Sequence, residues 1–146
     1  MIITDFNRKL SEAKEKNVLR NISGYPFYTS PHGYKLKMRV ELNQTRKEYK
    51  DHMGVFIFVM KSEHDAILSW PFKKKCTFTL IDQQDNEEER KNIVKTMTPE
   101  GQENFKKPIE KENPGYGFAN FVSHATLQTR KYIKDDTVFI TVSIEQ

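Results

Sequence analysis

The chain has 146 residues, and 30% of its side chains are charged, with a net charge of +4. This is the size of a single domain, spanning residues 1–146, that can bury a core without disulfides or a metal. The 24 Lys and Arg are interspersed with 20 Asp and Glu instead of clustering on one element, which argues against nucleic-acid binding. The sequence has no apolar run long enough to span a membrane and no signal-peptide pattern, so we expect neither membrane insertion nor secretion. The single cysteine, Cys76, excludes an internal disulfide and favours a cytoplasmic location.

The N-terminal segment predicts one short helix. Phe6, Leu10 and Ala13 fall on one face at helical spacing, and Thr4 or Asp5 precedes them as a candidate N-cap. We expect this helix to cover one end of a sheet.

Residues 34–42 predict a half-buried β-strand. Apolar and charged residues alternate along the whole segment, and side chains on a strand alternate between its two faces. The charged face carries Lys37, Arg39 and Glu41 in a row. We therefore expect these three side chains to face solvent, with Arg39 available to a ligand.

The remaining chain predicts further strands separated by turns. Residues 55–60 are apolar on both faces, which is typical of a central strand, and residues 137–144 alternate strictly as a closing strand. Shorter candidate strands cover residues 18–22, 27–29, 76–81 and 117–122, whereas the charged residues 83–91 predict an exposed loop. About eight short strands predict an all-β protein, an eight-stranded antiparallel β-sandwich.

Several segments, in their order and spacing, resemble one family over essentially the whole chain. They are Phe27-Tyr28-Thr29, Gly33-Tyr34-Lys35-Leu36 with Arg39, Asp65-Ala66-Ile67-Leu68 running into Trp70-Pro71-Phe72, Leu80-Ile81-Asp82-Gln83, Phe105-Lys106-Lys107-Pro108, Phe121-Val122-Ser123-His124 and residues 132–140. The chain thereby resembles the C-terminal TRAF domain, or MATH domain, of the tumour necrosis factor receptor-associated factors.

The resemblance implies a signalling adaptor domain that binds short, extended peptides against a sheet edge. The partners it implies are the cytoplasmic tails of receptors or upstream adaptors. It also implies a longer parent that forms a homotrimer through an N-terminal coiled coil, with RING and zinc-finger modules before it. The usual Trp-x-Ile start of the family is missing, with Met1 at the Trp position, so we expect the chain to be an excised or truncated domain.

The resemblance also assigns a peptide site. One group of the family uses an Arg-x-Tyr pair and a Ser cluster, but here Glu41 follows Arg39 and Gln102-Glu103-Asn104 precedes Phe105. The Gly-aromatic-Gly-aromatic segment of residues 115–118 instead resembles the Toll and interleukin-1 branch. That branch implies a pocket made by Arg39, Tyr116 and Phe118 for a Pro-x-Glu-x-x-(aromatic or acidic) peptide.

The residues around this segment admit both a binding and a structural interpretation. Tyr116 and Phe118 must share a face of their strand, and both could equally belong to the sandwich core. Gly115 and Gly117 favour binding, because glycine lets another backbone approach closely, and Pro114 suits the start of an edge strand. Phe56 could form the floor of the groove or be buried in the core.

No catalytic, metal or cofactor site is expected. The four histidines are scattered among turns and loops without metal-ligand spacing, and Cys76 alternates with apolar residues that predict its burial. Two other functions remain open beside peptide binding: a structural or oligomerisation domain with a decayed groove, and a substrate-recognition module for ubiquitin ligation.

Overall fold

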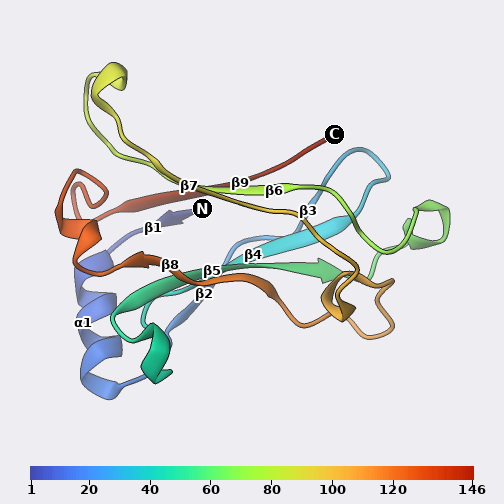
Figure 1. Ribbon diagram of the computed structural model, residues 1–146, viewed down its shortest axis with the longest axis horizontal. Helices are drawn as coiled ribbons and strands as arrows, with labels where there is room; N and C mark the ends of the chain where they lie inside the picture. The colour runs from blue at the N-terminus through green and yellow to red at the C-terminus, as the bar shows by residue number, and fades with distance from the viewer.

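The computed structural model describes all 146 residues as two antiparallel sheets with one α-helix at one end (Figure 1). The first sheet has the order β1-β9-β6-β7, and the second has the order β2-β4-β5-β8 with β3 also paired to β4. The strands are β1 Ile2–Ile3, β2 Asn21–Ser23, β3 Phe27–Tyr28, β4 Lys35–Glu41, β5 His52–Met60, β6 Cys76–Leu80, β7 Ile93–Met97, β8 Tyr116–Ser123 and β9 Val138–Ile144. The predicted antiparallel β-sandwich is thereby confirmed, with nine strands of which two have only two residues.

The core lies between the two sheets and is built from the apolar faces of alternating strands. Leu36, Met38 and Val40 of β4 are buried, as are Cys76, Phe78 and Leu80 of β6. As predicted, β5 is a central strand, paired with β4 on one side and β8 on the other. The single α-helix has 11 residues, which is too short to span a membrane.

The helix α1, Phe6–Lys16, covers one end of the sandwich with the predicted residues Phe6, Leu10 and Ala13 buried. Its N-terminus differs from the prediction, because Asp5 has a left-handed backbone and makes no side-chain cap. A distant residue takes this role: the Asp136 carboxylate accepts a hydrogen bond of 2.8 Å from the Asn7 amide. The helix start is therefore stabilised by the loop before β9.

One predicted strand began at the wrong residue, and one strand was not predicted. The segment 18–22 was expected to be extended, but β2 begins only at Asn21, because Arg20 has a φ of 51° that ends extended pairing. Strand β7 was not predicted, since Lys95 and Thr96 interrupt the apolar pattern of Ile93–Met97. Five short 3₁₀ helices complete the fold: Lys47–Tyr49, Asp65–Ile67, Glu87–Glu89, Glu103–Phe105 and Thr126–Gln128.

Candidate functional site

The outer face of the β4-β5-β8 sheet, which faces away from the core, brings together three of the predicted site residues. Arg39 of β4 lies opposite Phe56 of β5, and Phe56 lies opposite Gly117 of β8. The neighbours of Arg39 and Phe56 along each strand are buried in the core, so these two side chains project outward. We call Arg39, Phe56 and Gly117 the outer row.

A second row runs beside the outer row and is centred on Phe58 of β5. Lys37 lies opposite Phe58 on β4, and Gly115 lies against the outer end of the Phe58 ring. The guanidinium carbon of Arg39 is 4.5 Å from the centroid of this ring, and Nζ of Lys37 is 5.1 Å from it. Phe58 thus holds two cations by cation–π attraction while its ring is almost fully covered. The sequence did not reveal this role, because Phe58 sits within a run that is apolar on both faces.

Both cations are also paired with acids from the same chain. Nη2 of Arg39 donates to Oε2 of Glu41 at 2.9 Å, and Nζ of Lys37 donates to Oε1 of Glu112 at 2.8 Å. Glu41 was expected to face solvent, but only 9% of its side chain is exposed. The second carboxylate oxygen of Glu41 accepts a hydrogen bond of 2.9 Å from Nε2 of Gln44, so the loop after β4 covers the carboxylate. Burial of this acid is possible because each of its oxygens has a donor.

Strand β8 forms the edge of its sheet, since it pairs with β5 alone. Two glycines, Gly117 within β8 and Gly115 just before it, keep the outer face flat. A Cβ on Gly117 would lie 2.1 Å from the Val55 carbonyl oxygen, and one on Gly115 would lie 2.5 Å from the Phe58 ring. Asn104 fixes the start of this edge by donating from Nδ2 to the carbonyl oxygens of Pro114 and Gly115, at 3.1 Å each. At Asn120 the edge is covered, because its carbonyl oxygen accepts a hydrogen bond of 3.0 Å from Nζ of Lys95 on β7. Before that point, the edge strand offers backbone groups on which a further strand can form.

Tyr116 and Phe118 lie on the inner face of β8, opposite the face that carries Arg39. Their partners on β5 are Ile57 and Val55, both buried. The ring of Tyr116 packs edge-on against Phe105 with centroids 5.3 Å apart, and that of Phe118 packs against Phe78 at 6.1 Å. The two rings do share a face, as predicted, but the structure does not place them in one pocket with Arg39. Both remain partly exposed along the β8 edge, where an added strand would contact either face.

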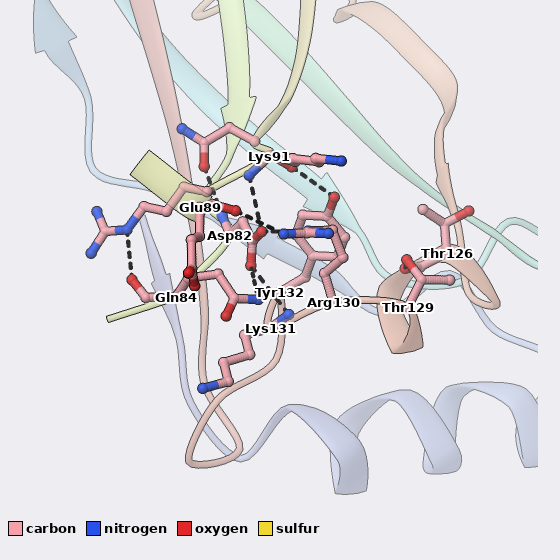
Figure 2. Close-up of polar contacts among 11 residues, drawn as sticks. Asp82, Gln84, Glu89, Lys91, Thr126, Thr129, Arg130, Lys131 and Tyr132 are labelled. Carbon is pink, nitrogen blue, oxygen red and sulfur yellow. Dashed lines mark hydrogen bonds and ion pairs between the residues drawn. The ribbon is translucent and has the colours of Figure 1, made fainter. Parts of the chain in front are cut away.

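A separate polar cluster joins two loops at the end of the other sheet (Figure 2). The fully buried carboxylate of Asp82 accepts hydrogen bonds from Nε of Arg130 at 2.7 Å and from the amides of Lys91 and Lys131 at 3.0 and 3.2 Å. Nε2 of Gln84 donates to the same carboxylate at 3.1 Å. With all its acceptors occupied from within the chain, this carboxylate is a structural link between loops and has no free position for a ligand.

The other reactive side chains are scattered. Cys76 is fully buried on β6, where its burial agrees with the predicted alternation. Its pKa is raised to about 12 by burial and, secondarily, by the charge of Glu145. His124 is buried, with a ring nitrogen 2.7 Å from the Leu42 carbonyl oxygen, and burial lowers its pKa. Cys76 and His124 lie on different elements, and each makes its hydrogen bond to a different backbone carbonyl, Lys74 and Leu42 respectively.

The chain matches known proteins over nearly its whole length. The sequence profile described as TRAF/meprin, MATH domain, matches residues 20–141. TNF receptor-associated factor 5 from Mus musculus is 36% identical over 146 residues, covering 98% of this chain and 25% of the relative. TNF receptor-associated factor 2 from Homo sapiens is 32% identical over 145 residues, covering 98% of this chain and 28% of the relative. The chain thus spans about a quarter of the length of these curated relatives.

A solved structure has the same fold. TRAF5 from Notothenia coriiceps superimposes with a TM-score of 0.88 at 26% sequence identity, covering 99% of this chain and 71% of that one. The matched profile, the relatives and the solved structure all agree with the family that the segment pattern suggested. This chain belongs to the TRAF/meprin MATH domain family, as a TRAF domain of the TNF receptor-associated factors.

Proposed function

We propose that this domain is a signalling adaptor module that binds the tail of a receptor or upstream adaptor as an extended strand beside β8. The observation that carries the proposal is the open edge of β8, flanked on its outer face by Gly115, Gly117, Phe56 and Arg39. The relatives are named as factors associated with TNF receptors, which supports receptor tails as partners. A cytoplasmic location and a non-enzymatic role go with this proposal.

The bound peptide would contact both the backbone of β8 and the side chains on the two faces beside it. Its backbone would pair with the free groups of β8, which gives affinity without regard to sequence. Its alternate side chains would reach the outer row on one face, and Tyr116 and Phe118 beside the opposite face. We keep the Pro-x-Glu-x-x-(aromatic or acidic) peptide as the first ligand to test.

The contact involves about half a dozen peptide residues that must be ordered on binding, so the affinity of one site is weak, with Kd on the order of 10–500 μM. In a longer parent that trimerises through a coiled coil, three such sites would hold clustered tails much more tightly through effective concentration. Adaptor function therefore rests on clustering rather than on the single site.

A titration of the labelled domain with this peptide, followed by NMR, tests the proposal. We expect the largest shifts at the amides of residues 114–119 and loss of affinity of at least about fivefold in Phe56→Ala, which removes the ring from the outer row. Val18→Ala is the matched control, because Val18 is an exposed apolar residue just before β2, at the edge of the sheet opposite β8, and it should leave Kd unchanged. Shifts confined to another surface, with Phe56→Ala binding normally, would place the function elsewhere.

A specific observation favours a structural or oligomerisation role as the second candidate. An apolar cleft of about 570 Å³ opens between the sheets at the edge opposite β8, lined by Met1, Ile2, Ile22, Tyr25, Phe27 and Met38 among others. Ile2 and Tyr25 at this cleft are largely exposed. Sedimentation of the chain at micromolar concentration distinguishes the two candidates, because the adaptor proposal expects a monomer or weak association of the isolated domain.

A further inference from the structure

We propose that Glu41 determines the ligand specificity of the outer row, because its ion pair with Arg39 neutralises the charge that a ligand would otherwise meet. The domain would then select extended peptides whose side chain facing Arg39 is uncharged, either aromatic or amide, over peptides with a carboxylate there. This inference rests on the proposed function, since it assumes that a peptide lies across the outer row.

The Glu41 carboxylate is held in place and cannot swing aside as an ordinary surface acid would. One of its oxygens lies 2.9 Å from Nη2 of Arg39 and the other 2.9 Å from Nε2 of Gln44. Gln44 is itself buried, and its backbone N–H donates to the His52 carbonyl oxygen at 3.0 Å. The donor that fixes the carboxylate is thus anchored to the backbone at the start of β5.

The guanidinium of Arg39 is equally constrained. One face of it covers the Phe58 ring at 4.5 Å, and its Nε is buried without a hydrogen-bond partner. Only 29% of the side chain is exposed. Arg39 therefore cannot turn away from Glu41 to meet a ligand without losing both the stacking and the ion pair.

The charge of the surrounding surface is balanced in the same way. Lys37, which also lies over Phe58, is neutralised by Glu112, with 19% and 26% of these side chains exposed. Around the Phe58 ring, two cations and two acids balance in charge. Lys35, the next residue on this face of β4, lies beyond Lys37 on the side away from Arg39. A ligand carboxylate would give up its hydration and approach Glu41 without meeting an uncompensated cation.

An uncharged ligand side chain avoids this cost. An aromatic ring can pack on the apolar surface of Phe56 and on the guanidinium edge, and an amide oxygen can accept from an Nη proton that Glu41 leaves free. Neither requires removal of Glu41. The residue therefore acts through Arg39 as a specificity determinant and does not need to touch the peptide.

The test uses two peptides, Pro-x-Glu-x-x-Glu and Pro-x-Glu-x-x-Gln, which differ only at the position expected to face Arg39. We expect the native domain to bind the Gln peptide at least as tightly as the Glu peptide. Glu41→Gln frees the positive charge of Arg39 with almost no change of shape, and should shift the ratio of the two Kd values about three- to tenfold toward the Glu peptide. This gained preference should shrink at high salt, as expected for a partly exposed charge.

Glu88→Gln is the matched control, because it makes the same change of net charge on the exposed Glu87–Glu89 turn of the other sheet. It should leave the Kd ratio unchanged. A native domain that binds the Glu peptide tenfold more tightly than the Gln peptide would overturn the inference without any variant. An unchanged ratio in Glu41→Gln, with shifts still on residues 114–119, would overturn it and leave the proposed function intact. Absence of binding by either peptide to any form would reject the proposed function and this inference together.

Discussion

Gly117 on β8 and Val55 on β5 lie so close that a Cβ on the glycine would be 2.1 Å from the valine carbonyl oxygen. The clash involves backbone that is paired in the sheet, so the strands would have to separate. We expect Gly117→Ala to lower the free energy of unfolding by about 1–3 kcal/mol. Urea unfolding measures this change. Gly24→Ala is the control and should cost less, since the nearest atom there is the flexible end of Met1 at 3.2 Å.

Arg39 has a structural role in addition to its proposed binding role, because it neutralises the nearly buried Glu41. The sequence alone places Arg39 on a solvent face and predicts that Arg39→Ala barely changes the melting temperature. The ion pair leads to a different expectation. Arg39→Ala should lower the free energy of unfolding by about 1–3 kcal/mol, because the Glu41 carboxylate keeps its hydrogen bond from Gln44 but loses its charged partner.

A double-mutant cycle separates the two effects of this substitution. In the double variant, Arg39→Ala with Glu41→Gln, no uncompensated charge remains. The double variant should therefore lose less stability than the sum of the losses in the two single variants. Additive losses in thermal or urea unfolding would mean that the ion pair contributes nothing. Glu48→Gln, at an exposed ion pair with Arg46, is the control and should change stability little.

The period of the sequence predicted most of the sandwich, and the reasons are physical. Strict alternation locates β4 and β9, and an apolar run on both faces identifies β5 as a central strand. β1 escapes this reasoning because it has only two residues, and it is held by pairing with β9 and by the burial of Ile3 in the core. Short strands take their conformation from their neighbours rather than from their own pattern.

The candidate site was predictable only in part, because alternation says which residues share a face but not which face that is. Tyr116 and Phe118 were correctly paired with each other, yet the register against β5 turns them inward and Gly117 outward. That register includes a shift between Met53 and Val55, which no local pattern in β8 indicates. Glu41 likewise follows the charged period of β4 but is buried by its contacts with Arg39 and Gln44, which are tertiary.

Cys76 should be chemically silent in the folded domain. Its pKa is raised to about 12, mainly by burial, so almost no thiolate exists near neutral pH. We expect a thiol reagent such as Ellman's reagent to label less than one site in native protein and a full site in urea. Labelling of native protein at the rate of a free thiol would show that the β6–β9 sheet opens readily.

Asp82 is expected to link stability to pH through the loop cluster of Figure 2. Burial alone would raise the pKa of this carboxyl, but hydrogen bonds from Arg130, the Lys91 amide and Gln84 outweigh burial and lower the pKa below its ordinary value of 3.8. A group with a lowered folded-state pKa stabilises the fold fully above its unfolded-state pKa. This contribution is lost as pH falls through the folded-state value, because protonation removes the charge that Arg130 pairs with.

Asp82→Asn tests this link, since an amide cannot accept from all four donors. The substitution also removes the ionic partner of Arg130, which keeps only its hydrogen bond to the Glu89 carbonyl oxygen. We expect Asp82→Asn to lower the free energy of unfolding by about 3–5 kcal/mol near neutral pH, measured by urea unfolding with Trp70 fluorescence. Stability should then fall less steeply than in the native protein as the pH is lowered below about 4. Asp85→Asn is the control: its carboxylate pairs with Lys134 in solvent, so the substitution should change stability much less. Equal losses in the two variants would mean that the buried hydrogen bonds of Asp82 contribute no more than an exposed ion pair.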